Sequence, residues 1–129
     1  MAASKEIFNT AKAPAPIGPY NQAVKAGNTL YVSGQIALSP QTGNLVDGSV
    51  SEEARQVLDN LSAVLDEAGY AFTDVVKTTI FLRDMGDFAA VNEVYGTYVT
   101  DQAPARETVA VAGLPKNVNV EISVIAWKA

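Results

Sequence analysis

Two charged side chains, Arg106 and Glu121, are of the types that bind a small anion and move protons beside it. Arg106 opens the alternating apolar run in APARETVAV, residues 103–111, and is one of only three arginines in the chain. A guanidinium can hold a carboxylate with two parallel hydrogen bonds. Glu121 lies within the apolar segment VNVEISVIAW, where a carboxylate is costly to bury unless it is paired or used. Together they predict a pocket for a small carboxylate with an acid–base group beside it.

The same two residues also fit a second interpretation, an ordinary ion pair at the rim of an interface, because such pairs are common and weak. The choice depends on where their two strands lie. The turn GLPKN, residues 113–117, separates these strands. If the turn folds the strands back as neighbours, Arg106 and Glu121 lie on the same sheet and can share a pocket.

Three further residues are candidates for the lining of such a pocket. Tyr20 follows the turn segment PIGP, where loops deliver functional groups, although a packing role also fits its position. Ser33 and Gly34 end a predicted strand, and a glycine there serves either a β-bulge or the close approach of a ligand to the backbone. On a predicted helix, Asn92 is expected to bond backbone and Tyr95 to pack in the core.

The composition narrows the chemistry that is available. The chain has 129 residues, no cysteine, no histidine and a formal net charge of −5. Thiol nucleophiles are therefore excluded and the commonest metal ligands are missing, and the carboxylates between Asp47 and Asp74 mostly flank a helix on its solvated side, so we expect no metal site. The negative charge disfavours nucleic acid as a partner. Because no segment is typical of a membrane span or a secretion signal, we expect one cytoplasmic domain covering residues 1–129.

Hydrophobic periodicity predicts the elements that position these residues. Ser49 and Glu52 have the spacing of a helix capping box, apolar residues follow at helical intervals, and Gly69 stands where a helix-ending glycine belongs. The other predicted elements are a hairpin turning at Gly27-Asn28, strands at 74–82, 106–112 and 118–127, and a helix within 87–99. The order β-β-α-β-α-β-β predicts an α+β fold in which one mixed sheet carries two helices on one face.

The last strand predicts that the sheet has an uncovered face. In residues 118–127, small and branched apolar residues alternate on the side that should pack on the helices, whereas Ile125 and Trp127 point the other way with Glu121. Two helices can cover only one side of a sheet. A contiguous apolar patch on the other side usually marks an interface. We therefore expect a homo-oligomer built on the uncovered face.

Five segments carry a family resemblance that covers nearly the whole chain. They are APIGPYNQAV, LYVSGQIAL, QVLDNLSAVLDEAG, DVVKTTIFLRDMGDFAAVNEVY and PARETVAVAGLPKNVNVEI. In this order and spacing the chain resembles the Rid family (reactive intermediate deaminase, also called the YjgF family), and the last segment is similar to its deaminase branch, RidA. The resemblance implies a chorismate-mutase-like fold assembled as a homotrimer with clefts between subunits. It also implies cofactor-free hydrolysis of 2-imino acids, such as 2-iminobutanoate and 2-iminopropanoate, or of their enamine tautomers, 2-aminocrotonate and 2-aminoacrylate, to 2-oxo acids and ammonia.

The resemblance further implies a role for each candidate residue. Arg106 would hold the substrate carboxylate. Glu121 would position or deprotonate the attacking water, or handle protons at the departing nitrogen. Tyr20 would contribute its hydroxyl, and the backbone around Ser33 and Gly34 would flank the ligand. Such a site needs few parts, because an imine is already electrophilic and must only be held beside a polarised water.

Two positions depart from the usual pattern of the family. Glu107 stands where a small residue is usual, and Thr108 stands where close relatives often have cysteine. Strand alternation puts Thr108 on the same side as Arg106, so we include Thr108 among the substrate-binding residues. Glu107 points away in an ideal strand. Near the mouth of the cleft, or paired with Arg106 across a bulge, it would weaken anion binding.

Two other functions stay open for the same fold. The first is a noncatalytic module whose cleft senses 2-oxo acids or other small carboxylates. The second is RNA cleavage or inhibition of translation, and the acidic composition and the lack of histidine argue against it.

Overall fold

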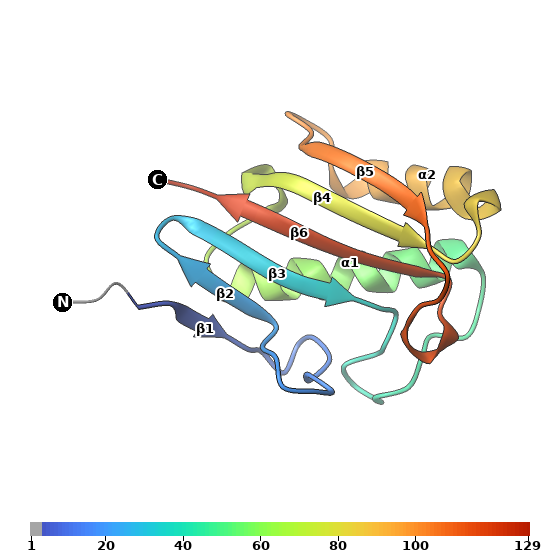
Figure 1. Cartoon of the computed structure of the whole chain (residues 1–129), viewed down its shortest axis with the longest axis horizontal. Coiled ribbons are helices and arrows are strands. Elements are labelled where there is room, and N and C mark those ends of the chain that lie inside the picture. The colour runs from blue at the N-terminus through green and yellow to red at the C-terminus, as the bar shows by residue number, and fades with distance from the viewer. Residues whose placement is uncertain (1–3) are drawn as a thin grey trace.

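The fold is one six-stranded sheet with two α-helices packed against one face (Figure 1). The computed structural model describes residues 4–129. The strands are β1 (Glu6–Phe8), β2 (Ala23–Ala26), β3 (Thr29–Gln35), β4 (Val75–Leu82), β5 (Ala105–Ala110) and β6 (Val120–Trp127). The helices are α1 (Val50–Glu67) and α2 (Phe88–Tyr98), with 3₁₀ turns at Phe72–Asp74, Met85–Asp87 and Pro115–Asn117. The predicted class, α+β with one mixed sheet and two helices, is confirmed.

The strands lie in the order β1-β2-β3-β6-β4-β5. All neighbours are antiparallel except β4 and β5, which run parallel. The predicted order of elements lacked β1. This strand has three residues, too few to display an alternating pattern, and it forms by pairing with β2 along the sheet edge, where Ile7 lies opposite Val24.

The condition that β5 and β6 are neighbours is not met, because β4 lies between them. β4, α2 and β5 form a crossover in which the helix returns the chain to the end of the sheet where β4 began. Such a parallel connection commonly places its two strands side by side. The turn at residues 113–117 therefore carries the chain past β4 to β6 instead of folding β6 back on β5.

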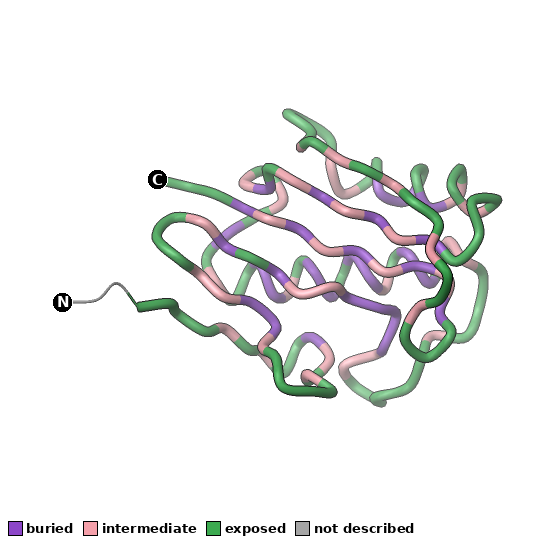
Figure 2. The backbone as a smooth tube through the Cα atoms, in the orientation of Figure 1, coloured by how far each residue is buried: buried purple, intermediate pink, exposed green. Residues whose placement is uncertain are grey.

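The two helices bury alternate side chains of the sheet, as the banding along β3, β4 and β6 shows (Figure 2). In β6 the inward-pointing residues from Val120 to Ala126 are buried, as the alternation predicted. α1 begins with the predicted capping box, in which the Ser49 hydroxyl accepts from the Glu52 amide at 3.2 Å. After α1 ends, Gly69 takes the left-handed conformation with φ +80°. In residues 4–129, neither helix combines the length and apolar character that a membrane crossing requires.

The opposite face of the sheet has no helix over it in the described part of the chain (Figure 1). Large apolar side chains lie on this face. Trp127 is 50% exposed and Tyr31 is 51% exposed, while Ile125, which pairs with Tyr31, is half-buried. The predicted uncovered face with large apolar groups is therefore confirmed, although Ile125 is less exposed than Trp127.

One carboxylate departs from the predicted solvated side of α1. Glu53 is buried, and its Oε2 accepts hydrogen bonds from the backbone amides of Asn119 at 2.8 Å and Val120 at 3.2 Å. Its Oε1 accepts from the side-chain amide of Asn119 at 2.8 Å. These bonds satisfy a buried charge and fix the start of β6, immediately before Glu121.

Candidate functional site

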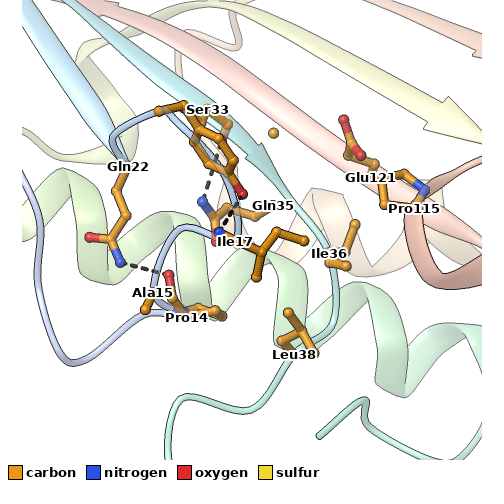
Figure 3. A pocket seen from close by; sticks show the side chains of 12 residues that line it. Pro14, Ala15, Ile17, Gln22, Ser33, Gln35, Ile36, Leu38, Pro115 and Glu121 are labelled. Carbon is orange, nitrogen blue, oxygen red and sulfur yellow. Dashed lines mark hydrogen bonds between the residues drawn. The ribbon is translucent and has the colours of Figure 1, made fainter. Parts of the chain in front are cut away.

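A cavity of about 340 Å³ lies where β3 ends beside β6 (Figure 3). Its volume is in the range of sites for small molecules. The wall combines proline and apolar side chains with a few polar groups. The lining residues are Pro14, Ala15, Ile17, Tyr20, Gln22, Ser33, Gly34, Gln35, Ile36, Leu38, Pro115 and Glu121. Four of the residues singled out from the sequence therefore lie around one cavity: Tyr20, Ser33, Gly34 and Glu121.

Glu121 is the acidic group of this cavity, and Gly34 makes room for it. A Cβ atom placed on Gly34 would lie 2.9 Å from the Glu121 Cδ and still closer to Oε2. The pairing of β3 with β6 also shifts register between Val32 and Gln35, which places a β-bulge at this glycine. Gly34 therefore lies at a β-bulge, as one sequence interpretation predicted. The group that approaches its backbone closely is the Glu121 side chain, whereas the other interpretation predicted a ligand. Glu121 is half-buried, and desolvation raises the pKa of its carboxyl group above the usual value.

Tyr20, in the loop before β2, and Ser33, in β3, both contribute hydroxyl groups to the cavity. The Tyr20 hydroxyl accepts a hydrogen bond from the Ile17 amide at 3.3 Å, and its side chain remains largely exposed. The Ser33 hydroxyl donates to the Asn21 carbonyl at 2.6 Å. Because that bond uses the hydroxyl proton, the Ser33 oxygen presents lone pairs and can only accept from a ligand.

The sequence interpretation missed Gln22, which supports the cavity wall. Gln22 is 1% exposed, and its Nε2 donates to the carbonyl oxygens of Thr10, Ala13 and Pro14. Its Oε1 accepts from the Thr10 amide at 2.6 Å. These bonds hold residues 10–14 against β2 and so shape one wall of the cavity. The available signal was a glutamine inside an otherwise apolar strand start, Gln22-Ala23-Val24.

Arg106 lies on the other side of the sheet from Glu121. It pairs with the buried Thr78 of β4, and its Nη1 donates to Asn92 Oδ1 of α2 at 2.8 Å. Its guanidinium also lies over the Tyr95 ring, 5.1 Å from the ring centre. Within one chain the arginine and the glutamate therefore form no shared pocket and no ion pair. Asn92, expected to bond backbone, instead binds the arginine side chain, whereas Tyr95 is buried as predicted.

The two positions that depart from the family pattern point in opposite directions. Glu107 pairs with Lys77 at 3.3 Å and so does not pair with Arg106. Thr108 faces the same way as Arg106, because their partners on β4, Ile80 and Thr78, are both buried under the helices. The Thr108 hydroxyl oxygen is buried and has no hydrogen-bond partner in the part of the chain that the structure describes. It is therefore a polar group that a ligand or water beside Arg106 can satisfy.

The acidic side chains do not gather into a metal-binding cluster anywhere in residues 4–129. The buried Glu53 does not line the cavity of Glu121, because its carboxylate accepts hydrogen bonds from the backbone amides of Asn119 and Val120. What the Glu121 cavity can do chemically is therefore accept and return a proton next to a small bound molecule.

Known proteins resemble this chain in both amino-acid sequence and fold. Residues 10–128 match the family model described as Endoribonuclease L-PSP. RidA from the Antarctic bacterium Psychrobacter sp. superimposes with a TM-score of 0.92 at 44% identity, covering 95% of this chain and 99% of that chain. The chain belongs to the Rid (YjgF) family.

Two further relatives of this Rid protein bear on its chemistry. The 2-iminobutanoate/2-iminopropanoate deaminase of Mus musculus is 52% identical over 122 residues, which cover 95% of this chain and 90% of that protein. The structure of TdcF from E. coli, which contains bound serine, matches with a TM-score of 0.91 at 42% identity and covers 96% of this chain and 99% of that one. The family thus includes a protein named as an imine deaminase and a protein that holds a small amino acid.

Proposed function

We propose that this Rid protein hydrolyses 2-imino acids, or their enamine tautomers, to 2-oxo acids and ammonia without a cofactor, with 2-iminobutanoate and 2-iminopropanoate as its substrates. The observation that carries the proposal is Glu121, a half-buried carboxylate with a raised pKa in a cavity of metabolite size. Perturbed carboxyl groups in clefts are typical of acid–base catalysts. The 52% identity to the mouse deaminase supports the same activity.

Hydrolysis of an imine needs a base for the water and an acid for the nitrogen. As the water oxygen bonds to C2, the Glu121 carboxylate accepts a water proton, and the electrons of the C=N double bond move to the nitrogen, which takes up a proton from solvent. The resulting carbinolamine then forms a C=O bond and breaks its C–N bond. Glu121 returns its proton to the nitrogen, which leaves as ammonia, and the hydroxyl proton is lost to solvent. A raised pKa favours this exchange near neutral pH.

We assign the polar contacts of the substrate to the groups that line the cavity with Glu121. The Tyr20 hydroxyl and the backbone at Ser33 and Gly34 would bind the reacting end of the imino acid. The apolar wall would receive its short side chain. This arrangement holds the imine carbon beside the water that Glu121 polarises, which is the main requirement for an electrophile that needs no further activation.

The substrate carboxylate needs a cation, and we assign this role to Arg106 of a neighbouring subunit, with Thr108 beside it. Arg106 lies on the edge strand β5, where a second copy can approach it. The uncovered sheet face, with Tyr31, Ile125 and Trp127, supports an association of chains. We propose a homotrimer in which each cleft joins the Glu121 cavity of one subunit to the Arg106 edge of the next.

A noncatalytic binding module is the second candidate. The serine in the structure of TdcF supports it, because a relative with the same fold binds a small carboxylate. The cleavage of RNA that the description of the family model names is less favoured here, since a chain with net charge −5 attracts phosphates poorly.

The experiment that separates these candidates follows the imine itself. A threonine dehydratase releases 2-iminobutanoate, and the purified protein is added while the formation of 2-oxobutanoate is timed. We expect the protein to accelerate hydrolysis and Glu121→Gln to lose the acceleration. Unchanged imine decay with the wild-type protein, together with measurable binding of 2-oxobutanoate, would refute the deaminase and favour the binding module.

A further inference from the structure

The guanidinium of Arg106 contacts three side chains of α2, one through a hydrogen bond and two through their aromatic rings. Its Nη1 donates to Asn92 Oδ1 at 2.8 Å. The guanidinium carbon lies 5.1 Å from the centre of the Tyr95 ring and 5.8 Å from the centre of the Phe88 ring. One hydrogen bond and two aromatic faces therefore restrict a side chain that otherwise has many rotamers.

The support behind Arg106 is itself anchored in the core. Tyr95 is buried, and its hydroxyl donates to the Thr78 hydroxyl oxygen at 2.9 Å. Thr78 is fully buried on β4 and is the residue that pairs with Arg106 across the parallel strands. The ring under the guanidinium is thus fixed to the same pair of strands that carries the arginine.

The bond to Asn92 leaves one edge of the guanidinium with all of its N–H donors available to a ligand. A guanidinium binds a carboxylate in a bidentate manner along the Nε–Nη2 edge or along the Nη1–Nη2 edge. Asn92 takes one of the two N–H groups of Nη1, whereas Nε and Nη2 have no hydrogen-bond partner within residues 4–129, so the Nε–Nη2 edge keeps all of its donors. The amide oxygen is also uncharged, so it orients the guanidinium without neutralising it.

We propose that Asn92, supported by Tyr95, is a positioning residue that presents the Nε–Nη2 edge of Arg106 to the substrate carboxylate. The inference rests on the proposed role of Arg106 in carboxylate binding, and it goes beyond that role by assigning the orientation to α2. A fixed guanidinium loses less freedom when the ligand arrives, so the effect falls on binding and not on the chemical step. Loss of Asn92 therefore raises KM and leaves kcat nearly unchanged.

The test is a calorimetric titration of the assembled protein with 2-oxobutanoate, a probe that reports carboxylate binding whether or not the protein turns over. Asn92→Ala is expected to bind about tenfold more weakly, the effect of one lost hydrogen bond to a charged group. Asn92→Asp keeps an acceptor at the same place but neutralises the guanidinium, so it should bind more weakly still. Glu93→Gln, on the exposed side of the same helix, is the matched control and should bind like the wild type.

The variants distinguish positioning from a structural role. If Asn92 only stabilised the fold, both variants would unfold at a lower temperature but, while folded, would bind 2-oxobutanoate like the wild type. If any acceptor sufficed at this position, Asn92→Asp would bind better than Asn92→Ala, and that order would overturn the claim that an uncharged partner orients Arg106. Equal affinity of Asn92→Ala and the wild type would overturn it too, as would a wild-type protein that does not bind 2-oxobutanoate. A wild-type protein that binds the probe, loses affinity in the predicted order and does not hydrolyse imines would leave this inference standing and refute the deaminase alone.

Discussion

The two faces of the sheet carry different halves of the chemistry that we propose. On the uncovered face, Glu121 lies in a cavity beside Gly34 that no cationic side chain of residues 4–129 lines, and desolvation raises the pKa of its carboxyl group. On the helix-covered face, Arg106 is bound to Asn92 and lies over Tyr95. A base with a raised pKa is ready to take a proton, and an oriented guanidinium is ready to take an anion. In the site that we propose, each face lacks what the other has, so one chain would hold two half-sites and a complete site would need two copies.

Removing the cation of the covered face should have the largest effect. We expect Arg106→Ala to lower kcat/KM for imine hydrolysis by at least about two orders of magnitude, because the cation that pairs with the substrate carboxylate is lost. Arg106→Lys should recover only part of the activity, since an ammonium cannot make the bidentate contact. Coupled assays with a threonine dehydratase measure both. Full activity of Arg106→Ala would contradict the role of the arginine.

Charging the uncovered face should separate the subunits. Ile125→Lys places a second cation next to Lys77, which pairs with position 125, on the surface that we propose to be the interface. We expect the mass in solution to fall to that of one 13.6 kDa chain and the activity to drop by roughly tenfold or more, because the half-sites no longer meet. Ser62→Lys, on the exposed side of α1, is the control and should change neither. A fully active monomeric variant would refute the shared cleft.

Filling the space at Gly34 tests the position of Glu121. A Cβ atom there would lie 2.9 Å from the Glu121 Cδ, so Gly34→Ala must displace the carboxylate. We expect kcat to fall by about tenfold while the fold persists, since enzyme sites tolerate small misplacement poorly. Gly96→Ala, with open space around its position on α2, is the matched control and should gain up to about 1 kcal/mol in the free energy of unfolding without loss of activity. If both variants kept full activity, Glu121 would not need its present position.

The raised pKa of Glu121 predicts a pH dependence with a definite sign. Because the base must be ionised, kcat/KM should fall as the pH is lowered through a pKa above the usual carboxyl value. A raised pKa means that the folded chain binds the proton of Glu121 more tightly than the unfolded chain does. The resulting contribution to the free energy of unfolding is present at low pH and is lost as the pH rises through the pKa of the folded state. Glu121→Gln should therefore raise the melting temperature at pH 7 and lose this advantage at low pH. A melting temperature that Glu121→Gln changes equally at both pH values would contradict the desolvated carboxylate.

Local signals in the sequence were sufficient for most elements of the fold. The capping box at Ser49 and Glu52 and the turn at Gly69 bound α1, and the alternation in β6 assigned each of its faces. The family resemblance, and not the strand pattern, put Tyr20, Ser33, Gly34 and Glu121 in one site; the pattern marked Gly34 as unusual without placing it beside Glu121.

What the sequence could not predict depends on contacts between distant segments. The place of β5 at the sheet edge follows from the crossover through α2, and β1 exists only through its partner β2. The hydrogen bond between Arg106 and Asn92 joins residues that are 14 positions apart in the sequence. The bonds of Gln22 to residues 10–14 join residues that are 8 to 12 positions apart, and neither separation belongs to a periodic pattern. The separation of Arg106 from Glu121 is the most important of these results, because the two strands are neighbours in sequence order but not in the sheet.

The most direct test of the two half-sites is complementation between two inactive variants. Arg106→Ala keeps the Glu121 cavity, Glu121→Gln keeps the arginine edge, and each should be inactive alone. If each site takes Arg106 from one subunit and Glu121 from the next, coexpression in equal amounts should restore about a quarter of the wild-type activity, since half of the subunits supply each intact half at random. Activity that stays at the level of the separate variants would contradict a site shared between subunits.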